Sequence, residues 1–390
     1  MPLIRKRILW EIAALIAGGF TIFIGLRVFG TVHHMMRDTG APVFGDFLNF
    51  FTGGAMAMRG DTAHLYNEAA NYAFQSALIP GFKLVLPYYE PPVFLLLMAP
   101  LSTLGYVAAA LVFMALSFVC YWTAAWRLAP DRRALIFAAS YPTPLLHLIN
   151  LQAGTIMAGF NGLALSFLQR RPILAGVFIS LLSIKPHLAV LWPVMLAVRG
   201  QWKTFFSAAI SLLALIAISG AIFGFDTYVA FFNNLTTAQS GITTLRTHPQ
   251  VYASLYANLL TLNVPAQIAS IVHGISALAA IAAAILIWRR GEANTSAVAL
   301  CAGTMLISPY LFFYDAAPLG IAALFLARTG LTPFRMAVMA LAFGAGLVGL
   351  YLGQHVTPPL HASAAWALML LAERQSRASA APAPAPAHRT

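Results

Sequence analysis

The sequence predicts an all-α polytopic membrane protein, and its composition and charge pattern carry this prediction. Of its 390 residues, 60% are hydrophobic and only 9% are charged, and the mean hydropathy is +0.79. A soluble chain of this length needs many charged side chains on its surface, so this composition places much of the chain in lipid. Apolar stretches recur along the chain, and small groups of Lys and Arg separate them.

The net charge of +12 comes from basic groups at 5–7, 132–133, 170–171, 199–203, 289–290 and 374–377. This distribution follows the positive-inside rule and forms no continuous basic patch, so we expect membrane lipids but no nucleic acid as partners. The rule places 199–203, 289–290, 328–335 and the C-terminus in the cytoplasm, and 33–90, 225–263 and 308–315 outside. It leaves the topology of 88–200 open.

The first apolar stretch, 8–32, follows a basic N-terminus and is too long for a signal peptide core, so we interpret it as a retained membrane anchor. Later stretches are often shorter than the roughly 20 residues that cross a bilayer, and prolines interrupt many of them. We therefore expect about 10 to 13 transmembrane or re-entrant helices. They form a single membrane domain, 1–377, followed by a disordered Ala/Pro tail, 378–390.

The first exterior loop holds the most informative carboxylate, Asp46. A carboxylate beside aromatic residues at a membrane surface needs an ionic partner, a helix to cap or a chemical role. Asp46, Asn49, Phe50, Gly53 and Ala57 have helical spacing on one face, so Asp46 fits an N-cap, a carboxylate with a chemical role, or both. Asp61, which precedes another helical stretch, reads as a helix cap.

Polar residues beside the next apolar stretches are candidates for substrate binding. Glu90, next to Pro91, fits either an interfacial anchor or a second carboxylate of a pocket. Gln152 fits either hydrogen bonding to sugar hydroxyls or a tie between helices.

Lys185, in the run Lys185-Pro186-His187, lies about 14 residues after Arg171, or about 20 Å along a helix. It therefore lies deep in a span or near the far end of it, in a helix that Pro186 breaks. An ammonium group at this depth needs an anion, and no nearby carboxylate is an obvious partner. A bound phosphate fits this need, with snorkelling to the interface as the alternative.

Late in the chain, Asp315 fits a helix cap, a partner for Lys185 or part of a pocket, and Tyr310 precedes it in the same polar-aromatic run. Arg246 and His248 are further candidate substrate contacts in the second exterior loop. The sequence lacks nucleotide-binding, zinc-protease and nucleophile-elbow motifs, and it lacks a DxD pair. We therefore expect no metal or cofactor, and a donor that arrives through the membrane.

The order of these motifs resembles glycosyltransferase family 87, also called DUF2029. The resemblance covers residues 8–372 and rests on the following runs: Gly45-Asp46-Phe47, Arg59-Gly60-Asp61, Leu65-Tyr66, Tyr89-Glu90-Pro91-Pro92, Gln152, Arg170-Arg171-Pro172, Ala175-Gly176, Lys185-Pro186, Arg199 with Trp202, and Ser308-Pro309-Tyr310. Where some members have His, this chain has Tyr310, so no histidine role carries over. The family is similar to mycobacterial mannosyltransferases that use polyprenyl-phosphate mannose.

The resemblance implies a GT-C helical bundle with a large first exterior loop and an active site at the outer face of a bacterial cytoplasmic membrane. It implies an inverting transferase that moves a sugar, expected to be mannose, from a polyprenyl-phosphate donor to a glycolipid or glycan acceptor. Asp46 would be its general base, and Lys185, with Arg59 or Arg246, would neutralise the leaving phosphate. The alternative is a transporter or flippase for a sugar or lipid-linked sugar.

Overall fold

The structure is a computed structural model of the chain. It describes residues 42–129, 150–237, 252–328, 332–351 and 360–380, together with a few single positions between and before them. Apart from Gly19 and Phe23, the expected first span, 8–32, lies outside the described residues, as do Arg246 and His248.

Every regular element in the described part of the chain is a helix, and the one β-type pairing there is an isolated bridge between Tyr252 and Phe312. Three helices are long and apolar enough to cross a membrane: α5 (Tyr106–Leu128), α11 (Trp202–Phe223) and α15 (Ala266–Arg289). Most of their residues are not buried inside the protein, as expected for surfaces that face lipid. The predicted all-α polytopic membrane protein is confirmed.

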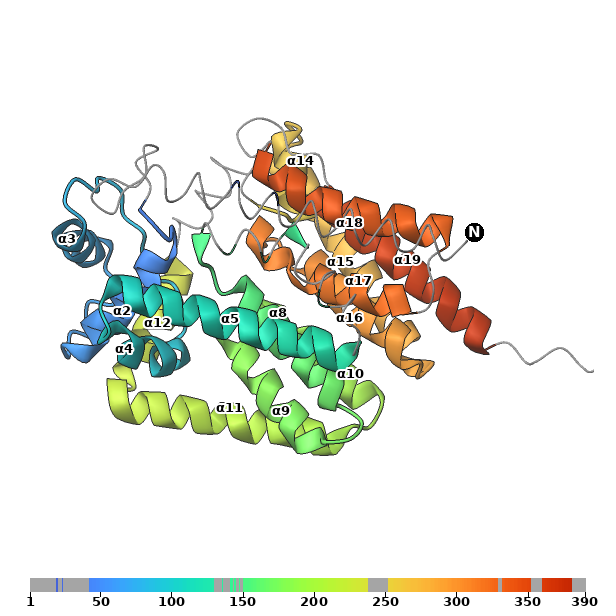
Figure 1. The fold of residues 1–390 in the computed structure, drawn as a ribbon, viewed down its shortest axis with the longest axis horizontal. Coiled ribbons are helices and arrows are strands. Elements are labelled where there is room, and N and C mark those ends of the chain that lie inside the picture. The colour runs from blue at the N-terminus through green and yellow to red at the C-terminus, as the bar shows by residue number, and fades with distance from the viewer. Residues whose placement is uncertain are drawn as a thin grey trace, which may run out of the picture.

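Shorter apolar helices fill the space around these spans (Figure 1). They are α8 (Gly154–Phe167), α9 (Pro172–Leu181), α10 (Leu191–Val198), α16 (Ala293–Ile307), α17 (Pro318–Arg328) and α18 (Pro333–Tyr351). The less apolar helix α19 (Leu360–Ala380) packs against α16 and α18. Two further helices, α12 (Asp226–Thr237) and α14 (Leu255–Thr261), belong to the expected second exterior loop. Helix α19 extends through Ala380, and the rest of the Ala/Pro tail lies outside the described residues.

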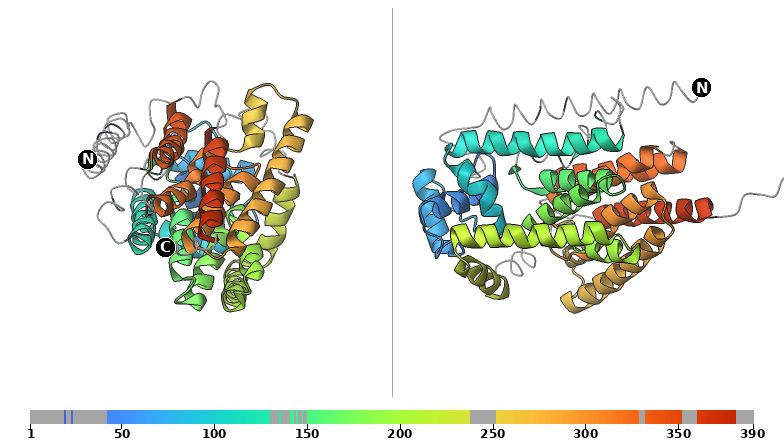
Figure 2. Two further views of the ribbon diagram at one scale, coloured as in Figure 1. Left: turned by 90° about the vertical axis from the view of Figure 1, so that its right-hand side faces the viewer. Right: turned by 90° about the horizontal axis from the view of Figure 1, so that it is seen from below.

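The first loop folds into α2 (Phe47–Met58) and α3 (Glu68–Leu78), which lie at one end of the bundle beside the start of α5 and the end of α11 (Figures 1 and 2). Helix α2 is buried and packs on α4 (Leu95–Ser102), which follows the short helix η1 (Pro92–Phe94). The approach is close because a Cβ on Gly54 would lie 2.4 Å from the carbonyl oxygen of Met98.

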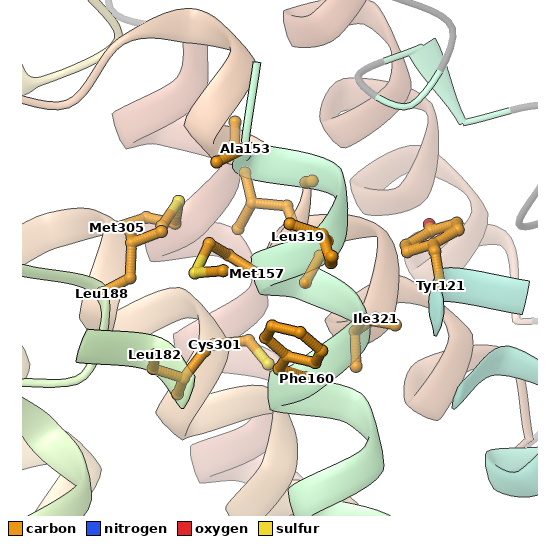
Figure 3. Packing of buried hydrophobic residues seen from close by; sticks show 14 of the residues in the cluster. Tyr121, Ala153, Met157, Phe160, Leu182, Leu188, Cys301, Met305, Leu319 and Ile321 are labelled. Carbon is orange, nitrogen blue, oxygen red and sulfur yellow. The ribbon is translucent and has the colours of Figure 1, made fainter. Parts of the chain in front are cut away.

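Helix α8 lies at the centre of the core and packs against α5, α9 and α17. Its apolar residues Met157 and Phe160 lie among buried side chains from several neighbouring elements, labelled in Figure 3 as Leu182, Leu188, Cys301, Leu319 and Ile321. Within a membrane, such helices are held together mainly by van der Waals packing of their side chains. This core fixes the N-terminus of α8, which carries part of the candidate site.

The predicted break at Pro186 is confirmed. Helix α9 continues into the short helix η2 (Leu182–Ile184), and a second short helix, η3 (Pro186–Leu188), leads toward α10. Lys185 lies between η2 and η3 with φ −128° and ψ 81°, outside the helical region. Proline has no N–H to continue a helix and disfavours helical angles in the residue before it, so the sequence accounts for this break.

Candidate functional site

Asp46 lies where the first loop meets the segment that precedes α8. Its backbone N–H donates to the carbonyl oxygen of Asn150 at 3.0 Å. The preceding residue, Gly45, has a φ of +53°, and a Cβ there would lie 2.9 Å from Cα of Asn150. Glycine is therefore required both for the left-handed backbone and for the close approach.

The side chain of Asp46 does not cap α2, although the residue occupies the N-cap position. Its backbone has helical angles, φ −69° and ψ −12°, and makes no side-chain cap hydrogen bond. Instead, Oδ2 accepts a hydrogen bond from Nε2 of Gln152 at 3.0 Å. The N-cap alternative is therefore wrong for the side chain, and Gln152 orients the carboxylate across the two segments.

Lys185 forms a buried ion pair with Asp315, which belongs to the short helix η5 (Phe313–Ala316). Nζ lies 2.6 Å from Oδ1, and the two side chains are 10% and 0% exposed. The alternative that Asp315 pairs with Lys185 is confirmed, and this partner comes from a segment 130 residues later in the chain. The snorkelling alternative fails, since Lys185 is buried.

Asp315 combines two of the roles expected for it. Its Oδ1 accepts from Lys185, while Oδ2 accepts from the backbone N–H of Phe312 at 3.4 Å and so caps η5. Nε2 of His187 lies 3.9 Å from the same Oδ2, which places His187 beside the pair. Lys185 also lies over the ring of Tyr314, with Nζ 4.9 Å from the centroid, a distance typical of a cation–π contact.

Helix η5 is held in place from two sides. A Cβ on Gly154, the first residue of α8, would lie 2.2 Å from the carbonyl oxygen of Tyr314, so the two backbones are in direct contact. The N–H of Ala253 donates to the carbonyl oxygen of Leu311, and the rings of Tyr252 and Phe312 stack with centroids 4.3 Å apart. These contacts position Asp315 and Tyr314 against the start of α8.

Glu90 completes the cluster of charged residues that also contains Asp46, Lys185 and Asp315. The residue is 9% exposed, and Oε2 accepts from the N–H of Tyr89 at 3.2 Å, while its carbonyl oxygen accepts from the hydroxyl of Tyr66 at 2.9 Å. Burial raises the pKa of Glu90 to about 7; Lys185 lowers it and Asp46 raises it. Glu90 is therefore a buried neighbour of Lys185 and Asp46, which favours the pocket interpretation over the interfacial anchor.

Three other residues that the sequence analysis singled out lie away from this cluster. Arg59 follows the end of α2, about 20 Å along the helix from Asp46, with its guanidinium over the ring of Phe74. Asp61 is not the expected helix cap: it pairs with His64 at 2.6 Å, and the side chain of Asn67 caps α3. Tyr310 is exposed in the turn before η5.

Tyr314 and Gly154 are site residues that the sequence did not single out. Tyr314 directly precedes the candidate residue Asp315, and Gly154 lies two residues after the candidate residue Gln152. Their roles depend on a contact between distant backbones and on the position of Lys185, and no local pattern signals either.

The cluster combines a carboxylate able to accept a proton, Asp46, with a buried ammonium group, Lys185. An ammonium has three N–H donors, and one of them goes to Asp315, so it retains capacity to bind an anion. Within the described ranges, no three His, Cys, Asp or Glu side chains are placed to hold a metal ion.

Comparison with family models gives a match to glycosyltransferase family 87 over residues 88–309, more than half of the chain. The matched segment contains Glu90, Gln152, Lys185 and His187, whereas Asp46 precedes it and Asp315 follows it. Comparison with curated proteins and with solved structures gives no match. On the strength of the family match, the chain belongs to glycosyltransferase family 87.

Proposed function

We propose that this membrane glycosyltransferase moves a sugar, with inversion, from a polyprenyl-phosphate donor to a hydroxyl of a glycolipid or glycan acceptor. The observation that carries the proposal is the orientation of Asp46. A carboxylate at a helix N-terminus commonly caps the helix, but this one is directed to Gln152. It lies near enough to Glu90 for its charge to act on that carboxyl, and Lys185 acts on the same group.

In the proposed reaction, Asp46 accepts the proton of the acceptor hydroxyl while that oxygen forms a bond to the anomeric carbon. The bond from the anomeric carbon to the phosphate oxygen breaks, and its electron pair leaves with the polyprenyl phosphate. A single displacement from the opposite face converts a β-linked donor into an α-linked product. General-base assistance of this kind contributes about 10²–10⁴-fold in rate.

Lys185 is proposed to bind the phosphate of the donor and to stabilise the charge that develops on it. Asp315 and the ring of Tyr314 hold the ammonium group in place, so it need not reorganise during the reaction. Such preorganised charges are most effective where water is scarce, as in this buried cluster.

The proposed active site faces the exterior of a bacterial cytoplasmic membrane, within a GT-C architecture. Two features support this orientation. The basic residues 199–203 precede α11, so α11 runs from the cytoplasm outward under the positive-inside rule. Phe223, at the end of α11, belongs to the same buried cluster as Met56 and Ala57 of α2, the helix that follows Asp46 (Figure 2). Mannose is the proposed sugar, on the resemblance described above.

The proposal is tested by reconstituting the purified protein with polyprenyl-phosphate [¹⁴C]mannose and a membrane glycolipid fraction. Asp46→Asn should reduce transfer by at least about 10²-fold and leave thermal unfolding unchanged. Asp61→Asn, the same substitution at an exposed carboxylate of the same loop, should retain full activity. Substantial transfer by Asp46→Asn would exclude the assigned base. Movement of intact donor across the bilayer without transfer would indicate a flippase.

A further inference from the structure

We propose that Glu90 is a donor-binding residue that carries a proton while the phosphate donor is bound, so that donor binding takes up a proton from solvent. This inference rests on the proposed function and adds a specific role for a second carboxyl group at the same site.

Packing of the neighbouring short helix and two hydrogen bonds fix the position of Glu90. It precedes η1, which packs against η2, the short helix that Lys185 follows directly. The hydrogen bond from Tyr66 to its carbonyl oxygen and the bond from the N–H of Tyr89 to Oε2 both restrain it. The carboxyl group is therefore held in a buried position where the charges of Lys185 and Asp46 act on it.

The charges of the cluster create the need for this proton. With every group ionised, Asp46, Glu90 and Asp315 carry three negative charges against the single positive charge of Lys185. A polyprenyl-phosphate sugar is a phosphodiester with one further negative charge, and repulsion between buried like charges is strong. A protonated Glu90 removes one negative charge and supplies an O–H donor for a phosphate oxygen.

The groups that face Glu90 from the surrounding elements are Lys185, Asp46 and three tyrosines, Tyr66, Tyr88 and Tyr314. On α12, which packs against η1, Tyr228 faces Tyr66 and Tyr88 and is hydrogen-bonded to Ser219. Burial raises the pKa of Tyr66 and Tyr88, so both remain neutral near pH 7. Burial also raises the pKa of Glu90 to about 7, which makes both of its forms accessible in that range.

The first test uses farnesyl methyl phosphate, a phosphodiester whose single charge stays constant from about pH 6 to about pH 9. Binding to the protein in nanodiscs is measured by titration calorimetry across this range. In the wild type, affinity should be constant below about pH 7 and fall about tenfold per pH unit above it. In Glu90→Gln, affinity should not change with pH, while the exposed control Glu68→Gln should behave like the wild type.

The second test needs no variant. At pH 8, calorimetry in buffers of different ionisation enthalpy should report close to one proton taken up for each phosphodiester bound by the wild type. Uptake near zero would overturn the inference, as would a pH dependence that persists in Glu90→Gln and so belongs to another group. Binding that is independent of pH would overturn this inference alone, whereas no binding at any pH would overturn the proposed donor as well.

Discussion

Lys185 and Asp315 form a buried ion pair with a distance of 2.6 Å, and each residue lies at a short 3₁₀ segment between longer helices. Lys185 separates η2 from η3, and Asp315 lies in η5. The two breaks bring both side chains to the same buried point.

Removal of one member of this pair should destabilise the protein strongly. Asp315→Leu leaves an uncompensated ammonium, and Lys185→Met leaves an uncompensated carboxylate; each should cost about 3–5 kcal/mol. The double variant should recover much of this loss, because it leaves no unpaired charge. Chemical unfolding in detergent measures the double-mutant cycle. Additive losses would show that the two residues do not interact, and Asp61→Asn serves as an exposed-pair control.

Gln152 should affect catalysis more than donor binding. Gln152→Leu removes the amide that orients Asp46 across 3.0 Å, and hydrogen bonds to charged groups contribute about 1.5–3 kcal/mol. We therefore expect kcat to fall by roughly 10- to 100-fold while KM for the donor changes little. Steady-state transfer assays measure both constants. A rise in KM at unchanged kcat would instead assign Gln152 to substrate binding.

Gly154 should tolerate no side chain. In Gly154→Ala, the new Cβ would meet the carbonyl oxygen of Tyr314 at 2.2 Å, so η5 or α8 must move. Because η5 carries Asp315, we expect lower thermal stability together with a loss of transfer. Gly274→Ala, in a helix where nothing lies within 4 Å of the added Cβ, is the matched control and should cause neither loss. Wild-type stability and activity in Gly154→Ala would contradict the backbone contact.

Ionisation of the buried Glu90 carboxyl should make the folded protein less stable as the pH rises. Its pKa is about 7 when folded and 4.5 when unperturbed, with burial as the main cause. Between these values the folded state binds more protons than the unfolded state, so the free energy of unfolding falls as pH increases from 4.5 to 7. The fall attributable to Glu90 is about 3 kcal/mol and is complete above pH 7.

The comparison of Glu90→Gln with the wild type isolates this contribution. The stability of the variant relative to the wild type should increase from pH 4.5 to pH 7, as measured by chemical unfolding at several pH values. A constant difference between the two proteins over this range would show that the buried carboxyl does not titrate as described.

The sequence was sufficient for features that depend on neighbouring residues. Proline after Lys185 predicts the helix break, and helical spacing after Asp46 predicts α2. The prediction that Asp61 caps a helix was wrong for two reasons. His64 hydrogen-bonds to the carboxylate of Asp61, and Asn67, which lies closer to α3, caps that helix instead. Sequence patterns do not show which of several neighbouring polar residues caps a helix, because that depends on the backbone angles of the turn before the helix.

Contacts between distant segments were beyond the reach of local patterns. The sequence offered Asp315 as a partner for Lys185 only as one of three alternatives, since no local pattern links the two residues. Composition alone leaves Glu90 equally suited to an interface or to a pocket. Its burial follows from the packing of η1 against η2, which requires the folded bundle. The pairing of Asp46 with Gln152 likewise depends on a close approach that Gly45 permits.

The separation of 130 residues between Lys185 and Asp315 has a consequence for biosynthesis. A ribosome adds about 5–20 residues per second, so the lysine is made roughly 7–26 s before its carboxylate exists. During that interval Lys185 has no Asp315 to pair with, and an unpaired charge within a membrane is costly. The buried ion pair can therefore form only late in translation, after the segment that carries Asp315 has been made.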